Sequence, residues 1–184
     1  MRLIISIILI FSTLNSFSQV LDKPSEGKVL VYITRSNDLG GAMNFRVYDK
    51  DLFLGALPSR AYFKYECEPG EHLFWAASEN RDFVEANLEA NKTYVIDLRA
   101  KLGMFIAAVG VEPYSPDNKR HVKRVNKVLK KHISANIVDS RKTEEKVENI
   151  AKAMEAYERV KSRQANKIKK LLPNMNFKNT DSDE

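Results

Sequence analysis

Glycine and proline divide this chain of 184 residues into two parts of different character. All seven glycines lie within residues 27–110 and 13 of the 17 aromatic residues lie within residues 32–114, whereas residues 117–172 contain neither glycine nor proline. Glycine and proline mark the turns of β-rich domains and are avoided inside long helices. We therefore predict an α+β protein, with a β domain over residues 27–114 followed by a helical region over residues 117–172.

Short apolar segments follow one another in the first part, and turn residues separate them. The segments recur roughly every 8 to 12 residues, and no helical pattern lies between them. This pattern favours an antiparallel β-sandwich, or a small barrel, of seven or eight short strands. The segments comprise residues 28–34, 45–48, 52–55, 62–67, 72–77, 83–88, 93–98 and 102–111.

The second part has the periodicity of amphipathic helices. Apolar residues recur three or four positions apart on both sides of residues 139–140, where an Asp-Ser pair is a natural interruption and helix start. Residues 117–172 are therefore predicted to form two helices with a break near this pair. Pro173 ends the second helix, and residues 173–184 are predicted to be a disordered polar tail. The second helix carries a heptad-like apolar seam, which consists of Val147, Ile150, Met154 and Tyr157.

The first 18 residues have the features of a secretory signal peptide. Arg2 precedes a short apolar run, and small residues follow it at Ser16 and Ser18. The run is shorter than the roughly 20 residues of a membrane-spanning helix, although a retained anchor or a buried first strand are alternatives. We predict cleavage before Gln19, a linker over residues 19–26, and a protein that is soluble in the periplasm or cell envelope of a bacterium. No cysteine lies near this boundary, so lipid attachment is not expected.

Positive charge is concentrated in the helical part. Residues 118–172 carry a net charge of +11, so the rest of the chain sums to −5. In the simplest interpretation, Val122, Val125, Val128 and Leu129 dock on the sandwich and the opposite, basic side of the helix faces water. This basic side could instead bind an anionic membrane surface or an acidic envelope polymer, whereas nucleic acid is not expected for an exported chain. The candidate contact residues of this basic side are Lys123, Arg124, Lys127 and Lys131.

Four motifs in the first part resemble a known bacterial type. They are FRVYDKDLFLG at residues 45–55, YFKY at 62–65, EPGEHLFWA at 68–76 and LEANKTY at 88–94. Together they resemble small exported domains of unknown function, many of them lipoproteins, with a PEGA-type or transthyretin-like β-sandwich and a "PGEH" turn. The resemblance covers about residues 27–112 and implies a β-sandwich used in the cell envelope. The turn at residues 49–51 lacks the glycine of that family, and Asn91 replaces it in a later turn, where asparagine tolerates the left-handed conformation.

The sequence contains no recognisable catalytic or metal-binding motif. His121 and His132 are eleven residues apart on one predicted helix, about 16 Å along its axis, too far to share a metal ion. His72 follows a turn and is interpreted as a strand residue with a satisfied ring rather than as a general base. Alternation points Cys67 inward as a small buried residue, with an intermolecular disulfide or a reactive thiol as alternatives. We expect no catalytic residue, no cofactor and no metal ion.

These observations favour a non-catalytic exported module of the cell envelope. Its C-terminal helices would mediate self-association or contact with another envelope component, through the apolar seam and the basic side. One alternative is a periplasmic ligand-binding or hydrolytic domain with a cleft near His72, and another is binding of an anionic membrane or polymer through the basic helix.

Overall fold

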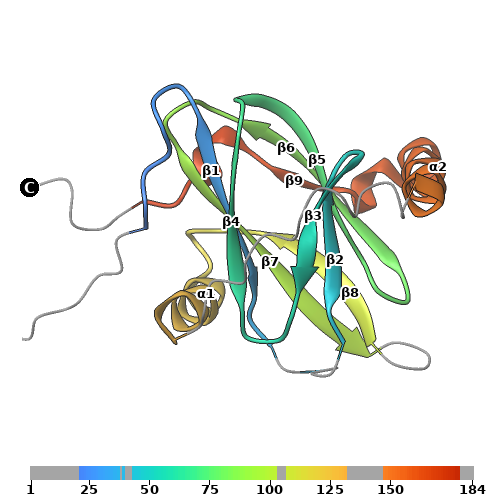
Figure 1. Ribbon diagram of the computed structural model, residues 1–184, viewed down its shortest axis with the longest axis horizontal. Helices are drawn as coiled ribbons and strands as arrows, with labels where there is room; N and C mark the ends of the chain where they lie inside the picture. The colour runs from blue at the N-terminus through green and yellow to red at the C-terminus, as the bar shows by residue number, and fades with distance from the viewer. Residues whose placement is uncertain (1–20, 38, 40–42, 103–106, 132–146, 179–184) are drawn as a thin grey trace, which may run out of the picture.

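Two β-sheets pack face to face in the computed structural model of the protein, which describes residues 21–37, 39, 43–102, 107–131 and 147–178 (Figure 1). Within these residues, sheet A has four strands in the order β4-β1-β7-β8, and sheet B has five in the order β3-β2-β5-β6-β9. The strands are β1 (Val29–Arg35), β2 (Phe45–Asp49), β3 (Leu52–Leu57), β4 (Tyr62–Cys67), β5 (Gly70–Ala77), β6 (Arg81–Leu88), β7 (Thr93–Leu102), β8 (Ala107–Pro113) and β9 (Lys169–Leu171). The helices are α1 (Lys119–Lys131), α2 (Val147–Gln164) and the short 3-10 helices η3 (Ala165–Lys167) and η4 (Pro173–Met175).

This architecture confirms the predicted α+β fold, with a β-sandwich followed by a helical region. The sheets are mixed rather than purely antiparallel, because β1 pairs with β7 and β6 pairs with β9 in parallel. The other pairs in the described residues are antiparallel. Parallel pairing arises here because the chain alternates between the two sheets, so β7 and β9 enter beside strands that lie far from them in the sequence.

The sandwich core is made of one face of each sheet. On β1, Val29, Val31 and Ile33 point into this core, as do Phe74 and Ala76 of β5. All seven residues of β1 are buried, so its second face is covered as well. An exposed sheet face would show a polar alternation instead.

Helix α1 covers the outer face of sheet A. Val125 and Leu129 pack against Leu30, Tyr32 and Val95 in an apolar cluster of their own. The structure therefore agrees with the interpretation in which the apolar side of this helix docks on the sandwich.

Helix α2 covers the outer face of sheet B, on the opposite side of the molecule (Figure 1). Ala153 and Tyr157 pack on an aromatic layer that includes Tyr48, Trp75 and Phe83. The rings of Tyr48 and Trp75 are stacked with centroids 3.9 Å apart, and the Trp75 indole donates a hydrogen bond to the carbonyl of Lys50 at 2.7 Å. The two helices thus complete four layers in the order α1, sheet A, sheet B, α2.

Three turns in the described residues depend on a left-handed backbone without glycine, and one of them contains Arg60, with φ of 56°, between β3 and β4. Asn91 has φ of 62°, as expected from its place in the turn before β7, and Lys50 has φ of 50° between β2 and β3. The Asn91 side chain also accepts a hydrogen bond from the backbone N–H of Gly27 at 2.8 Å. This contact fixes the entry of the chain into β1. Part of the segment predicted as a linker is also held by the domain, because the backbone N–H of Ser25 donates to Glu66 Oε2 at 2.8 Å.

The C-terminal end differs from the prediction. The second helix was expected to reach residue 172, but α2 ends at Gln164 and β9 pairs with β6. The tail predicted to be disordered is ordered as far as residue 178, since the backbone N–H of Phe177 donates to the carbonyl of Thr93 at 2.7 Å and its ring packs on Tyr114. The spacing of Ile168 and Leu171 resembles a helical repeat, yet both are buried outside the helix because the sandwich edge offers an apolar site.

Other predictions fall outside the described residues. The signal peptide over residues 1–18, the helix break near residues 139–140 and the last residues 179–184 belong to this group. Across the part of the chain that is described, neither α1 nor α2 has the length and apolar character that crossing a membrane requires.

The burial of β9 predicts that the end of the chain contributes to stability. Replacing Leu171, which is fully buried, with alanine is expected to lower the free energy of unfolding by about 2–5 kcal/mol, as for other large-to-small core substitutions. Leu172→Ala is the matched control, because Leu172 is the next residue in the chain and its side chain is 46% exposed. Urea unfolding of both variants measures the difference, and equal losses would contradict the burial of β9.

Candidate functional site

A pocket of about 580 Å³ lies beside the second half of α2, on the outer side of sheet B. Strands β5, β6 and β9, helix α2 and the turn between β2 and β3 all contribute to its wall. The volume is within the range of small-molecule sites, roughly 300–1,000 Å³. Its lining residues are Lys50, Glu71, His72, Leu73, Glu85, Ala86, Asn87, Met154, Tyr157, Glu158, Lys161, Lys170, Leu171 and Leu172.

A hydrogen-bonded group joins α2 to β6 inside this pocket. The Tyr157 hydroxyl donates to Glu85 Oε1 at 2.6 Å, and Lys161 Nζ donates to the same hydroxyl at 2.9 Å. Lys161 also lies 3.5 Å from Glu85. The hydrogen bond from Tyr157 lowers the pKa of Glu85, and burial raises the pKa of Tyr157. Spacings of three and four residues place Met154, Tyr157 and Lys161 on one side of α2, so they all face the pocket.

His72 lies at the rim of the pocket with both ring nitrogens engaged. Nδ1 is 2.7 Å from Asp49 Oδ2, and Nε2 is 2.9 Å from the carbonyl oxygen of Glu68. Both partners are acceptors, so both nitrogens donate and the ring is an imidazolium. The hydrogen bond to Asp49 raises the pKa of His72 to about 10. This agrees with the sequence interpretation of a satisfied ring, because a protonated imidazole has no lone pair to act as a base.

Cys67 is buried at the sandwich core, as the alternation predicted. It packs in the same cluster as Phe63, and its thiol is free of a disulfide. Tyr65 also points toward this region, and its hydroxyl donates to Asp49 at 3.2 Å. Asp49 Oδ2 therefore accepts hydrogen bonds from both Tyr65 and His72, and this small network holds the His72 ring in place.

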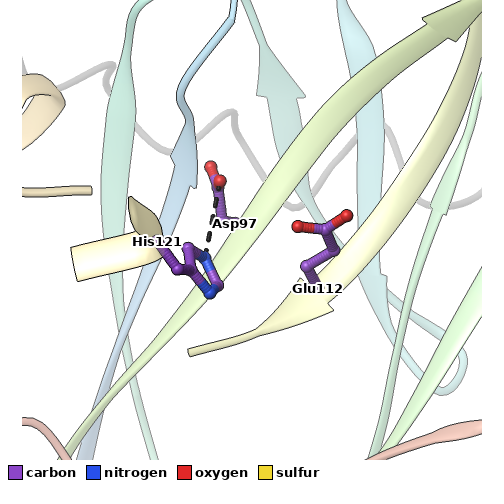
Figure 2. Close-up of side chains that lie close together, drawn as sticks. All are labelled: Asp97, Glu112 and His121. Atoms are coloured by element: carbon purple, nitrogen blue, oxygen red, sulfur yellow. Dashed lines mark ion pairs between the residues drawn. The ribbon is translucent and has the colours of Figure 1, made fainter. Parts of the chain in front are cut away.

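A second polar cluster lies on the other side of the molecule, between α1 and sheet A. Asp97 of β7, Glu112 of β8 and His121 of α1 each offer one ligand atom, and these atoms all lie within 4.8 Å of one another. Asp97 and Glu112 are directly opposite each other in the antiparallel pair of β7 and β8. Figure 2 shows the His121 ring facing the Asp97 carboxylate, with Glu112 beside them. Asn118 accepts a hydrogen bond from the backbone N–H of His121, which places the histidine in the first turn of α1.

Hydrogen bonds from β1 and the following residue hold the Asp97 carboxylate in place. Its Oδ1 accepts from the Thr34 hydroxyl at 3.0 Å and from the backbone N–H of Ser36 at 3.1 Å. Its Oδ2 accepts from the Ser36 hydroxyl at 2.6 Å. Asp97 is fully buried, so these donors replace the water that an ionised carboxylate requires.

Two arginines border this cluster. Arg99 lies 3.2 Å from Glu112 Oε1, and Arg124 lies 3.5 Å from Glu112 Oε2 and 3.9 Å from Asp97 Oδ2. His121 Nε2 lies 3.6 Å from Asp97 Oδ2, and it has no hydrogen-bond partner among the described residues. The arginine charges balance the two carboxylates, but the imidazole nitrogen remains buried and unsatisfied.

The predicted seam of α2 faces the protein's own sheet. Tyr157 is buried and Ile150 and Met154 are half-buried in the aromatic layer on sheet B, while Val147 is 63% exposed. Three of the four residues expected to contact a partner are therefore used within the molecule, and two of them, Met154 and Tyr157, line the pocket.

The predicted basic side of α1 is divided by the structure. Lys123 and Lys127 are exposed, as expected for a side that faces water. Arg124 instead turns toward Glu112 and Asp97. The side chain of Lys131 lies outside the described part of the chain.

Sequence reasoning missed the Asp97–Glu112–His121 cluster and the Glu85–Tyr157–Lys161 group. It tested His121 only against His132, which shares its helix, and so overlooked ligands on other elements. One usable signal was Asp97 itself, a carboxylate within the apolar segment 93–98 of an otherwise buried strand.

Comparison with known proteins gives one similarity. The chain is 28% identical over 106 residues to an uncharacterized protein of Haemophilus influenzae, and the match covers 56% of this chain and 62% of that protein. The match thus spans less than two thirds of the relative. No protein-family model matches the chain. No solved structure matches it either.

The ion pair of His72 and Asp49 predicts a pH-dependent stability. Because folding raises the pKa of His72 from about 6.5 to about 10, this contribution is fully present below pH 6.5 and is lost as the pH rises toward 10. We expect the free energy of unfolding of the wild type to fall over this interval by more than about 1.4 kcal/mol, the equivalent of one pKa unit. Urea unfolding between pH 6 and pH 10 measures it.

His72→Gln provides the control for this pH dependence. It removes the titrating ring, so its stability should change less than that of the wild type over the same interval. A wild type and a variant with parallel pH profiles would show that the ring is not held as an imidazolium.

Proposed function

We propose that the protein is a non-catalytic, exported module of a bacterial cell envelope that binds a small organic anion in the pocket between α2 and sheet B. The observation that carries this proposal is the composition of the pocket wall. Leu73, Met154 and Leu172 supply apolar surface, while Lys50 and Lys170 supply positive charge. A site whose wall combines apolar surface with charged groups is suited to a small amphipathic ligand.

Two lysines of the pocket could bind an anion. The lining contains three lysines and three glutamates, and Glu85 is neutralised by Lys161 and hydrogen-bonded to Tyr157. The charge of protonated His72 is balanced by its partner Asp49, so Lys50 and Lys170 are the groups of the wall that would attract an anion. An organic acid with an apolar body would place its carboxylate or phosphate near the lysines and its body against α2.

Two observations support a role in binding rather than in catalysis. His72 is protonated and bound on both ring nitrogens, so it cannot take a proton from a substrate. The Cys67 thiol is buried on the core side of the sheet rather than in the pocket. The earlier alternative of a ligand-binding domain with a cleft near His72 is therefore favoured over a hydrolytic one.

The proposed location rests on the sequence. Residues 1–18 have the features of a signal peptide, and the family resemblance over residues 27–112 is to exported domains. The similarity to a Haemophilus influenzae protein is compatible with a bacterial module. In this proposal the helices cover the sandwich and do not mediate self-association through the seam, because most of the seam is already buried.

The pocket predicts binding of an amphipathic anion such as 8-anilinonaphthalene-1-sulfonate. Met154→Trp should fill the pocket and weaken binding about tenfold, equivalent to about 1.4 kcal/mol. Ala151→Trp is the matched control because residue 151 is exposed on the same helix. Fluorescence titration measures both affinities, after urea unfolding has shown that the variants are folded.

A charge substitution separates pocket binding from adsorption of the dye elsewhere. Lys170→Gln should weaken binding, whereas Lys152→Gln, an exposed change on α2, should not. Equal affinities for Met154→Trp, Lys170→Gln and the wild type would refute the pocket as the binding site.

A second candidate function is contact with an anionic envelope surface through α1. The exposure of Lys123 and Lys127 favours it, since both point away from the sandwich. Co-sedimentation with vesicles that contain anionic lipid is expected, and it should fall steeply between about 50 and 200 mM salt. The double variant Lys123→Glu/Lys127→Glu should lose this binding, whereas Lys152→Glu/Arg159→Glu, with the same change of charge on α2, should retain it. Equal loss in both variants would indicate attraction by net charge alone and would contradict a role for α1.

A further inference from the structure

The cluster between α1 and sheet A has features that its structural contacts do not explain. Two carboxylates, those of Asp97 and Glu112, lie directly opposite each other on neighbouring strands, an arrangement that favours a cation beside them. His121 is about 95% buried, and its Nε2 points at this pair without a hydrogen-bond partner among the described residues. An unsatisfied buried nitrogen is unfavourable, so a group that binds it would stabilise the fold.

We propose that Asp97, Glu112 and His121 form a binding site for a divalent transition-metal ion of the zinc type. The three side chains come from β7, β8 and α1 and converge at the interface of the helix with the sheet (Figure 2). The ion would bind to His121 Nε2 and to one carboxylate oxygen from each acidic residue. It would fix the first turn of α1 on sheet A.

The distances fit ligands of one ion better than a direct ion pair. His121 Nε2 and Asp97 Oδ2 are 3.6 Å apart, which is longer than a normal hydrogen bond. Two ligands on a tetrahedral ion with bonds of about 2.1 Å are about 3.4 Å apart. The widest separation in the cluster is within 4.8 Å, so small side-chain rotations bring the third ligand into range.

The type of donor selects the ion. One imidazole nitrogen with two carboxylates suits Zn²⁺ and similar transition metals, whereas Mg²⁺ and Ca²⁺ prefer oxygen ligands alone. The Asp97 carboxylate is already oriented by Thr34 and Ser36, and such supporting hydrogen bonds are typical of metal ligands.

Arg124 is the cation that competes for this position. Its guanidinium lies 3.5 Å from Glu112 and 3.9 Å from Asp97, so neither contact has the short geometry of a strong charged hydrogen bond. The side chain is one-third exposed, and a long arginine can turn its head into water while its stem stays on the surface. Binding of the metal ion would therefore displace Arg124 from Glu112 Oε2 and leave Arg99 on Glu112 Oε1.

Titration of the purified protein with Zn²⁺ alone, followed by calorimetry, tests the proposal. We expect one ion per chain for the wild type, and at least tenfold weaker binding for His121→Gln and for Glu112→Gln. Arg124→Gln should bind Zn²⁺ several-fold more tightly, because it removes the competing cation. A purely structural role of the cluster would not produce this opposite effect.

Matched controls separate this site from other zinc-binding groups. His72→Gln removes a histidine outside the cluster and Glu148→Gln removes an exposed carboxylate, and both should bind Zn²⁺ as the wild type does. If His121→Gln does not fold, Glu112→Gln carries the test, because its side chain is 24% exposed and its loss leaves the buried Asp97 contacts in place. The proposal is overturned if the wild type binds no stoichiometric Zn²⁺, or if Glu112→Gln binds it as tightly as the wild type.

Discussion

Strand β1 and the second half of β5 are buried on both faces, and the rest of the structure depends on this constraint. Every residue of β1 is buried, and on β5 the inward Phe74 and the outward Trp75 are equally inaccessible to water. A two-layer sandwich would leave the outer residues exposed at a cost of roughly 1.5–3 kcal/mol for each large side chain. The protein solves this with a helix on each outer face, so the helical region is a structural necessity of the β domain.

The same constraint places the polar groups. Helices pack most closely where their apolar side chains meet the sheet, at Val125 for α1 and Ala153 for α2. Polar groups lie beside these contacts, with His121 in the first turn of α1 and Lys161 near the end of α2. The two candidate sites thus have a common origin, because each lies where a helix meets a sheet and low solvent access strengthens polar interactions.

The sequence was informative about elements and less so about their partners. Alternation and turn residues predicted the strands well, because the side-chain period of a strand is visible within a few residues. The pairing of β1 with β7 was not visible, since parallel neighbours are distant in the chain and leave no local signal. Strand β9 was read as helix because three residues of mixed character carry too little periodicity to distinguish the two.

The candidate site was less predictable than the fold for a related reason. Asp97 follows Val95 on the outer face of β7, where a carboxylate normally indicates contact with water. That face is buried only because α1 packs on it. The spacing of residues in the sequence does not show where a helix packs. His121 was recognised as a histidine on a helix, but its ligand partners lie on two strands that precede it in the chain. The pocket beside α2 was anticipated only through its rim residue His72.

Strand β9 also has a consequence for how the chain must assemble. Lys169 of β9 pairs with Val84 of β6, which precedes it by 85 positions in the sequence. The backbone N–H of Phe177 then donates a hydrogen bond to the carbonyl of Thr93. In a chain that lacks these last residues, β6 would be the edge strand of sheet B and would carry unpaired backbone groups. The apolar surface on which α2 packs would also lack Ile168. A nascent or C-terminally shortened chain would therefore expose an unpaired strand edge, which is prone to aggregation with other copies of the chain. The strand pairing of sheet B is therefore complete only when the chain as far as Leu171 is present.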